Sequence, residues 1–270
     1  PHAIQDLVTT GDFIRRGGVK RTQGGKLSRG SLKNLAATTA GGEPYADDTS
    51  HHALPYFRHS LLIDLVEELP QATFDLLADA EIQSANFLRR CLAGLSNNLE
   101  WAVKHLLPHL RLRYPYGWAT ADGADQLDAL LRIFGWMPPG LWLTREDLLT
   151  FCRYRNMDGV FFELGCLDVE MSVASENSGF RTRRTYRHGL EPRYLEGVVT
   201  WPLLSALALT FSALGLLEIA YEAPKNEEYR AKSENFLSPY EGVQAVRLTD
   251  IGAYAFGKTE HLDIPQLSSN

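Results

Sequence analysis

Residues 213–222 read ALGLLEIAYE, and further along the chain residues 246–254 read VRLTDIGAY. In the first stretch an apolar helix runs into Gly215, and glycine permits the left-handed turn that commonly ends a helix. Leu217, Ile219 and Tyr221 then alternate with Leu216, Glu218 and Ala220, as expected for a strand with one buried face. In the second stretch Thr249 is placed to cap a short helix. The predicted order is therefore helix, strand, loop, strand and short helix.

This order resembles the second half of a winged helix, over about residues 194 to 258. In that family a helix is followed by a Gly-Leu-hydrophobic strand, a wing loop, and a strand that ends in Leu-Thr-x-x-Gly. The matching segments here are Gly215-Leu216-Leu217, the loop from Ala223 to Gly242, and Leu248-Thr249-Asp250-Ile251-Gly252. The resemblance implies a fold that is most often used to bind nucleic acid, although many winged helices bind protein instead.

The N-terminal segment is similar to helicase-associated winged-helix modules, in which a Gly-Lys-Leu-Ser-x-x-x-Leu run follows the first strand. Residues 25–32, GKLSRGSL, carry that run. Gly24 to Ser28 reads as a turn, and a helix is expected to follow it with Ser28 or Ser31 as its N-cap. The sequence thus predicts a second winged-helix-like unit near the N-terminus.

The predicted fold class is mostly α with short β-strands, with tandem winged-helix-like units flanking a helical middle region. Apolar spacing predicts a helix from Phe57 that ends at Pro70, and helical periodicity continues from Phe74 to about Leu112. Thr144 is expected to cap a later helix, with Asp147 three residues on. The expected divisions are a winged-helix-like unit at 1–72, a helical domain at 73–167, a basic loop at 168–193, a C-terminal winged helix at 194–260 and a tail at 261–270.

Composition sets the outer limits on function. The chain has 270 residues, a formal net charge of −6 and 44% hydrophobic residues, which fits one or two globular domains without a basic field over the whole molecule. The three cysteines, Cys91, Cys152 and Cys166, are expected to be free and buried in a reducing compartment. The apolar run from Trp201 to Leu217 falls short of the roughly 20 residues that a membrane span needs. We therefore expect a cytoplasmic protein with no membrane partner, which could be part of a longer chain because no initiator Met is present.

Polyanion binding must then come from local basic segments. Between Gly11 and Lys33 the chain has seven basic residues and one acidic residue, and a second cluster begins at Arg181. These segments are candidates for phosphate contacts, and an aromatic residue in the second could stack on a base. The candidate residues are Arg15, Arg16, Lys20, Arg21, Lys26, Arg29, Lys33, Arg181, Arg183, Arg184, Tyr186 and Arg187.

Two features favour other interpretations. The segment 43–81 has nine acidic residues against one Arg, so it could neutralise the cluster at Arg181 within the chain or between subunits. The helix Trp201 to Leu214 has no Lys or Arg and is apolar on all sides, which predicts a buried helix and not one that enters a DNA groove. The N-terminal basic segment could equally be a solvated arm.

No motif in the chain indicates catalysis. A Gly-x-Ser-x-Gly elbow and phosphate-binding glycine loops are missing from the sequence. His51, His52 and His59 fit no metal-ligand spacing, and the five tryptophans are expected to be core or helix-packing residues. We therefore expect no catalytic, metal or cofactor-binding residues. The leading hypothesis is a non-enzymatic, nucleic-acid-associated module of a larger assembly that contacts DNA through local basic patches. The alternative is a protein-interaction or oligomerisation module that uses the winged helix as a packing platform.

Overall fold

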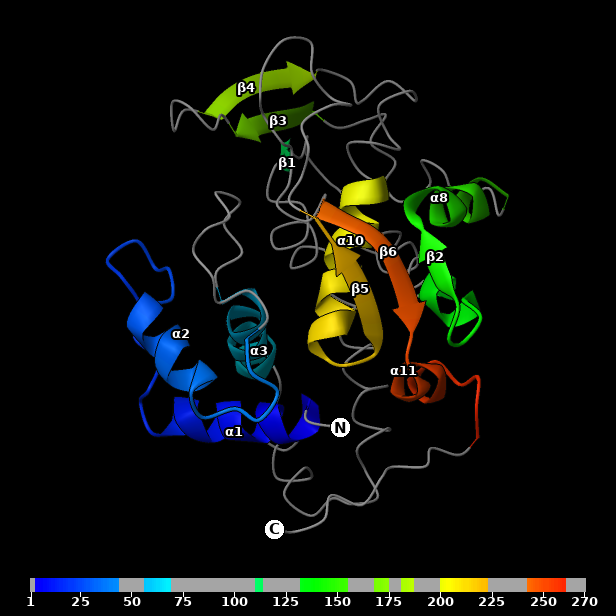
Figure 1. Cartoon of the computed structure of the whole chain (residues 1–270). Helices are drawn as coiled ribbons and strands as arrows, with labels where there is room; N and C mark the ends of the chain where they lie inside the picture. The colour runs from blue at the N-terminus through cyan, green and yellow to red at the C-terminus, as the bar shows by residue number, and fades with distance from the viewer. Residues whose placement is uncertain are drawn as a thin grey trace. The chain divides into compact units, whose positions relative to one another are not determined.

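The computed structural model describes residues 3–43, 56–68, 110–113, 132–154, 168–174, 181–186, 200–222 and 242–260. This part of the chain is mostly helical and contains two small antiparallel sheets, each of three strands. The predicted fold class, mostly α with short strands, is confirmed at that level (Figure 1). The chain divides into two compact units, each built from discontinuous segments, and the segments are described separately below.

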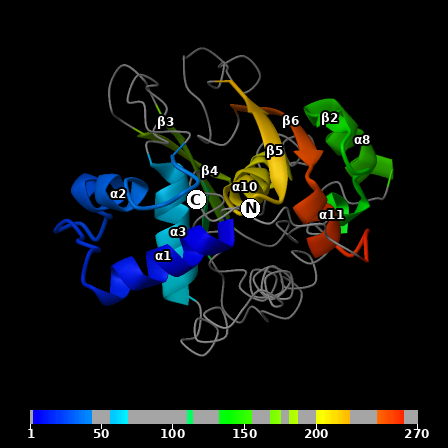
Figure 2. The same cartoon turned by 60° about the horizontal axis from the view of Figure 1, so that its bottom comes forward.

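Three helices form the N-terminal part of the first unit: α1 (Ala3–Arg15), α2 (Arg29–Ala36) and α3 (Phe57–Glu68). Both α1 and α2 contact α3, and α1 crosses it (Figures 1 and 2). Leu32 and Leu35 of α2 pack with Ile63 of α3 in a buried cluster. The predicted helix that begins at Phe57 is confirmed over Phe57–Glu68, and its predicted end at Pro70 lies outside the described residues.

The start of α2 confirms the predicted cap. Ser28 Oγ accepts a hydrogen bond from the Ser31 amide at 3.2 Å. The segment before it forms an isolated antiparallel bridge between Arg21 and Leu27, closed by the Thr22 amide donating to the Lys26 carbonyl at 2.8 Å. Among the described residues up to 68, this bridge is the only strand-like pairing. The strands of a wing would follow α3, outside the described residues.

The sheet β2–β6–β5 is made of β2 (Trp142–Thr144), β6 (Val243–Leu248) and β5 (Leu217–Tyr221), and all of it except Leu217 belongs to the second unit. β2 pairs antiparallel with β6, with Leu143 opposite Val246. β5 and β6 form a hairpin, because the Glu222 amide after β5 donates to the Gly242 carbonyl before β6 at 2.8 Å. The predicted strand at Leu217 to Tyr221 is confirmed, with alternating burial along it.

Helix α8 (Arg145–Tyr154) follows β2 directly and has the predicted cap. The Thr144 amide and hydroxyl both donate to Asp147 Oδ2, at 2.8 and 2.7 Å, and the Asp147 amide returns a bond to Thr144 Oγ1 at 3.3 Å. These bonds stabilise the ionised carboxylate and lower the pKa of Asp147 below 3.8. Leu148, Leu149 and Cys152 form the buried face of α8, and Cys152 is a free thiol as expected.

Helix α10 (Trp201–Ala213) is buried along its whole length except at Ser212, as its uniformly apolar sequence predicts. The turn that follows the helix contains Gly215, whose φ of +73° lies in the left-handed region. Thr249 then closes this end: its hydroxyl donates to the Gly215 carbonyl at 2.8 Å and accepts from the Gly252 amide at 3.0 Å, which caps α11 (Asp250–Ala255). Both predictions, the left-handed glycine and the Thr249 cap, are confirmed.

Three buried polar atoms lie at or just before one end of α10. Thr200 Oγ1, Trp201 Nε1 and Ser205 Oγ have no hydrogen-bond partner among the described residues. A buried polar group without a partner typically costs about 1–3 kcal/mol.

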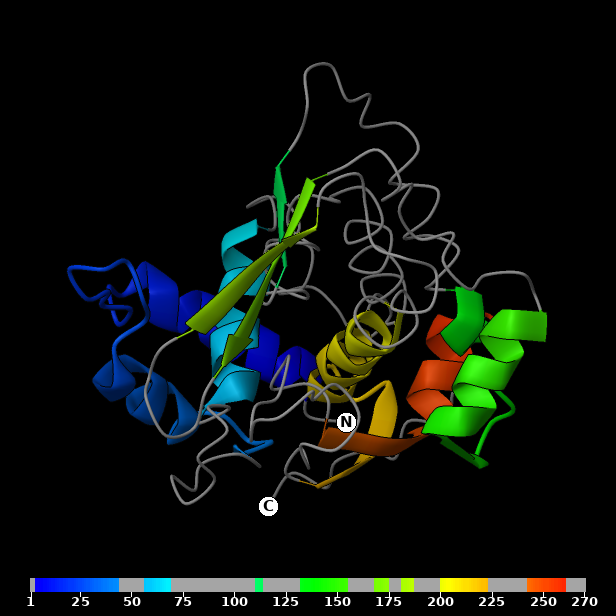
Figure 3. The same ribbon diagram turned by 90° about the horizontal axis from the view of Figure 1, so that it is seen from above.

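The second sheet corrects two predictions. Its order is β1–β3–β4, with β1 (Leu110–Arg113), β3 (Asp168–Ala174) and β4 (Arg181–Tyr186), and β3 and β4 lie side by side (Figure 3). The helical pattern predicted up to Leu112 is therefore wrong at β1, and the basic loop predicted for 168–193 contains two strands. In LRLR (110–113) and DVEMSVA (168–174), apolar residues alternate with polar ones, which is the pattern of a strand. The high polarity of the region makes this pattern easy to read as a loop.

No helix within the described ranges is both long and apolar enough to cross a membrane. The predicted tail at 261–270 lies outside the described residues.

Candidate functional site

The seven basic residues predicted near the N-terminus are all exposed and lie on three consecutive pieces of backbone. We call them the N-terminal basic surface. They occupy the end of α1, the turn around the Arg21–Leu27 bridge, and the outer positions of α2. The members are Arg15, Arg16, Lys20, Arg21, Lys26, Arg29 and Lys33.

Hydrogen bonds hold the turn against the first residues of α2, so the segment is not a free arm. The Ser31 hydroxyl donates to the Gly18 carbonyl at 2.9 Å and accepts from the Lys20 amide at 2.8 Å. The Ser28 amide donates to the Lys20 carbonyl at 2.8 Å. The basic residues of the turn are thereby brought next to those of α2, where Arg29 and Lys33 are one helical turn apart.

Two members of the N-terminal basic surface are partly neutralised. Arg15 pairs with Asp12, and Arg21 Nη2 lies 2.5 Å from Glu67 Oε2. Within the described part of the chain, no acidic partner is found for Arg16, Lys20, Lys26 or Lys33. Most of the positive charge of this surface is therefore available to an external anion.

The predicted second cluster lies on β4, an edge strand of its sheet. Arg181, Arg183, Arg184 and Tyr186 all belong to this strand, with Met171 opposite Arg184 and Ser172 opposite Arg183. Because successive strand residues belong to opposite faces, Arg183 and Arg184 stand on different faces of the sheet. The cluster is thus divided between two faces, and Arg187 lies outside the described residues.

Two acidic residues in the described part of the segment 43–81 have basic partners. Glu67 pairs with Arg21 of the N-terminal basic surface, and Glu43 pairs with His59.

Sequence reasoning missed a buried polar network formed by Asp6, Thr39, Glu43, Arg58 and His59. Asp6 Oδ2 lies 2.5 Å from Arg58 Nη2, and the Asp6 carboxylate also accepts the backbone amides of residues 40 and 41 at 2.8 and 3.0 Å. Arg58 donates a further bond to the Gly42 carbonyl at 2.9 Å. The network therefore fastens the loop after α2 to both α1 and α3.

The buried polar network requires glycine at position 41. A β-carbon at this position would lie 2.5 Å from Asp6 Oδ2 and 2.7 Å from Arg58 Nη2, closer than side chains allow. The ion pair and the loop can approach this closely only because residue 41 has no side chain.

The other half of the buried polar network has the order carboxylate, imidazole, hydroxyl. His59 Nδ1 lies 2.7 Å from Glu43 Oε2, and its Nε2 lies 2.6 Å from Thr39 Oγ1. Hydrolytic triads use the same order, but their hydroxyl must face a substrate. Here Thr39 and His59 are buried, so the arrangement orders the loop and leaves no hydroxyl in position to attack a substrate.

Two signals in the sequence could have revealed the network. Asp6 occupies a position on the apolar side of α1, next to buried Leu7, and a charge there requires a buried partner. His59 likewise shares a helix face with buried Leu62 and Ile63 of α3.

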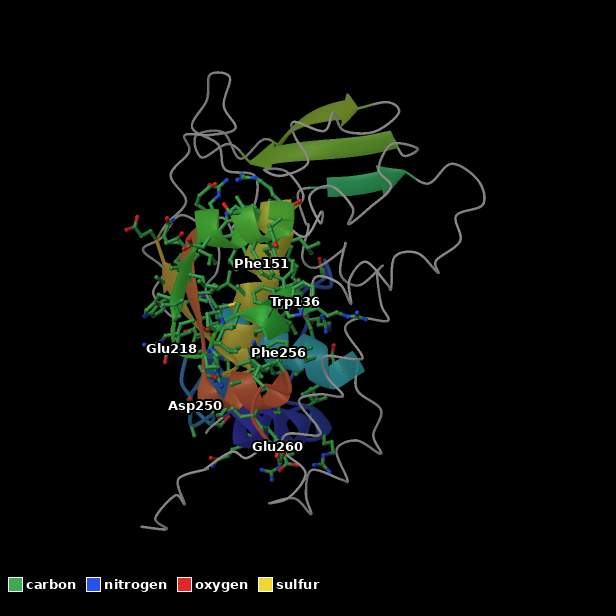
Figure 4. All side chains as sticks on the ribbon, turned by 90° about the vertical axis from the view of Figure 1, so that its right-hand side faces the viewer. Trp136, Phe151, Glu218, Asp250, Phe256 and Glu260 are labelled. Atoms are coloured by element: carbon green, nitrogen blue, oxygen red, sulfur yellow. The ribbon has the colours of Figure 1, made fainter. Side chains whose placement is uncertain are left out.

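The second unit exposes apolar side chains around β2, which we call the β2 aromatic surface. Trp136 is 40% exposed, Leu141 53% and Trp142 41%. Trp136 contacts Phe151 of α8 edge to face, with the ring centroids 5.6 Å apart. Both residues are labelled in Figure 4. The Arg247 guanidinium lies 5.0 Å from the centre of the Trp142 ring. The expectation that the tryptophans are core or helix-packing residues holds for Trp201, which is buried, and for Trp136, which packs against Phe151 of α8. It is wrong for Trp142, which is 41% exposed on β2.

No group of His, Cys, Asp and Glu within the described ranges could hold a metal ion. No family model matches the chain, and comparisons with curated proteins and with solved structures find no match.

Proposed function

We propose that this protein binds nucleic acid through the N-terminal basic surface and carries a C-terminal winged-helix-like unit. The observation that carries the proposal is the set of exposed basic side chains held on a hydrogen-bonded turn and the adjoining α2, four of them without an acidic partner among the described residues.

The winged-helix part of the proposal is supported by the hairpin that follows α10. A left-handed glycine follows helix α10, β5 and β6 form a hairpin, and Thr249 caps α11 after the second strand. The additional strand β2 extends this hairpin to three strands. The wing loop itself falls at residues 223–241, outside the described part of the chain.

Binding of this kind should depend little on base sequence. The helix that would read bases in a DNA-binding winged helix is α10, which has no Lys or Arg and is buried. The remaining contacts are between basic side chains and phosphates, which position a protein on nucleic acid without reading the sequence.

The test is fluorescence anisotropy with labelled duplex and single-stranded DNA of two unrelated sequences, repeated over a salt series. We expect affinity that falls steeply with salt and differs little between sequences. Replacing Arg16, Lys20, Lys26 and Lys33 with Gln should weaken binding and reduce the slope of log K against log salt by about 0.9 for each duplex phosphate that these side chains no longer neutralise. A double Arg183→Gln/Arg184→Gln variant tests the cluster on β4.

Lys258 supplies the matched control, because it is exposed and lies outside the N-terminal basic surface. Lys258→Gln should leave the salt slope unchanged. Absence of binding at low salt, or equal losses of affinity in the control and the fourfold variant, would contradict the proposal.

A second candidate function is self-association, which the β2 aromatic surface favours. Exposed aromatic side chains beside an edge strand are suited to a protein contact. Sedimentation over a concentration series measures this directly. An assembled species that Leu141→Asp dissociates would support it, and a monomer at every concentration would exclude it.

A further inference from the structure

The sheet β1–β3–β4 has two unlike faces. Successive residues of a strand alternate between the faces of a sheet, and residues directly opposite each other share a face. The strand pairing therefore assigns every residue of this sheet to one face. The apolar face contains Leu110, Leu112, Val169, Met171 and Val173. The polar face contains four arginines from two distant segments of the chain, Arg111, Arg113, Arg181 and Arg183.

The arginines of β1 stand opposite acidic residues on the polar face. Arg111 is opposite Glu170 of β3, and Arg113 is opposite Asp168. Unlike charges directly opposite each other favour the pairing of two antiparallel strands. The placement of these charges therefore supports the register of β1 against β3.

The arginines of β4 have no such counterpart in the register. Arg181 is opposite Ala174, and Arg183 is opposite Ser172. The acidic residue nearest to them in the register, Glu170, is only diagonal to Arg183 and is directly opposite Arg111. The positive charge of the polar face is therefore least balanced along β4, which is an edge strand of its sheet.

The spacing along β4 suits a ligand with repeated negative groups. Arg181, Arg183 and Thr185 follow one another on the polar face, about 6.6 Å apart at the usual rise of a strand. The guanidinium group matches phosphate in a two-pronged geometry, and arginine and threonine are both among the residues that contact nucleic-acid phosphates. We call these three residues the β4 row.

We infer that the β4 row binds phosphates of a nucleic-acid backbone. An antiparallel sheet commonly packs one face on the core and leaves the other in water, and the composition of the two faces assigns the polar face to the ligand. Arg184 and Tyr186 stand on the apolar face and take no part, so the contact includes no base stacking by Tyr186. The inference rests on the proposed function for its ligand and adds a contact that is separate from the N-terminal basic surface.

The test compares two neighbouring arginines of β4 in the full chain by fluorescence anisotropy with labelled duplex DNA over a salt series. Arg183→Gln should weaken binding and lower the slope of log K against log salt by about 0.9, the value for one duplex phosphate. Arg184→Gln makes the same change of charge one residue away, on the apolar face, and should leave the slope unchanged. A general effect of net charge would alter both variants alike.

A second matched pair keeps the test decisive if either arginine variant fails to fold by circular dichroism. Thr185→Ala removes a hydroxyl from the β4 row and should weaken binding about two- to tenfold, the range for one hydrogen bond. Thr182→Ala makes the same change on the apolar face and should leave the affinity unchanged.

Equal affinities within each matched pair would overturn the inference, and so would displacement of the DNA by polyglutamate as effective as displacement by unlabelled DNA at equal charge. If the fourfold variant of the N-terminal basic surface loses affinity while Arg183→Gln does not, the inference fails and the proposed function stands. The reverse result supports the β4 row and contradicts the proposed N-terminal contact. Absence of binding at low salt contradicts both.

Discussion

The N-terminal helices and the α10–β5–β6 segment differ in what they bury: both contain apolar residues, but only the N-terminal helices also bury paired charges. In the former, a buried ion pair and a buried histidine–carboxylate contact fasten a loop to two helices. In the latter, a helix without any charged residue supplies the core. The N-terminal helices therefore add the pairing of buried charges to their apolar cluster, whereas α10 supplies apolar contact alone. Different substitutions should therefore destabilise the two regions.

Arg58→Met should cause the largest loss of stability in the first region. It leaves the Asp6 carboxylate buried without its cation, which typically costs about 3–5 kcal/mol. Urea unfolding followed by circular dichroism measures the change. Arg21→Met removes an exposed ion pair and should cost only about 0–1 kcal/mol. Equal losses in the two variants would show that the buried polar network adds no special stability.

Leu207→Ala is the corresponding change in the second region. Leu207 is fully buried in α10, and a large-to-small change in a core costs about 2–5 kcal/mol. Unfolding curves at low and high salt sharpen the comparison of the two regions, because the loss of stability in Leu207→Ala should not depend on salt. A loss of less than about 0.5 kcal/mol, which is typical of a surface substitution, would show that the helix is not the core of its region.

Gly41→Ala tests the close approach inside the buried polar network. The new methyl group would collide with Asp6 and Arg58, and overpacking of this kind costs about 1–3 kcal/mol. Gly30→Ala is the control with the opposite sign, since nothing lies within 4 Å and alanine favours the helix α2 by about 0.5–1 kcal/mol. Thermal unfolding of the two variants should therefore shift in opposite directions, and shifts in the same direction would contradict the assigned role of Gly41.

The smallest expected effect is a change in the pKa of Asp147, an exposed residue at the start of α8. The Thr144 bonds lower the folded-state pKa of Asp147 below 3.8, so its contribution to stability is present above the unfolded pKa and is lost as the pH falls through the folded pKa. Thr144→Val should return the pKa of Asp147 toward 3.8. An NMR titration of the carboxyl group measures this, with Thr150→Val on the same helix as the control. An unchanged pKa in Thr144→Val would show that the cap does not act on the carboxylate.

Features that depend on a few neighbouring residues could be predicted before the structure. The caps at Ser28, Thr144 and Thr249 and the left-handed turn at Gly215 were all predictable, because each is formed within a few positions of the chain or by backbone preference alone. The exposed N-terminal basic residues also followed from composition. The strands β1 and β3 were missed although their alternation is present, since short polar segments give weak signals.

The amino-acid order alone was thus enough to place several helix ends and to require that α10 be buried, because uniform apolarity permits no other environment. Only the folded chain establishes that Asp6 pairs with Arg58 and that residue 41 must be glycine. The same holds for Trp142, which stays at the surface although tryptophan is usually buried. The physical reason is that pairing and burial depend on which distant segments meet. No local sequence pattern predicts which distant residues will pair with each other.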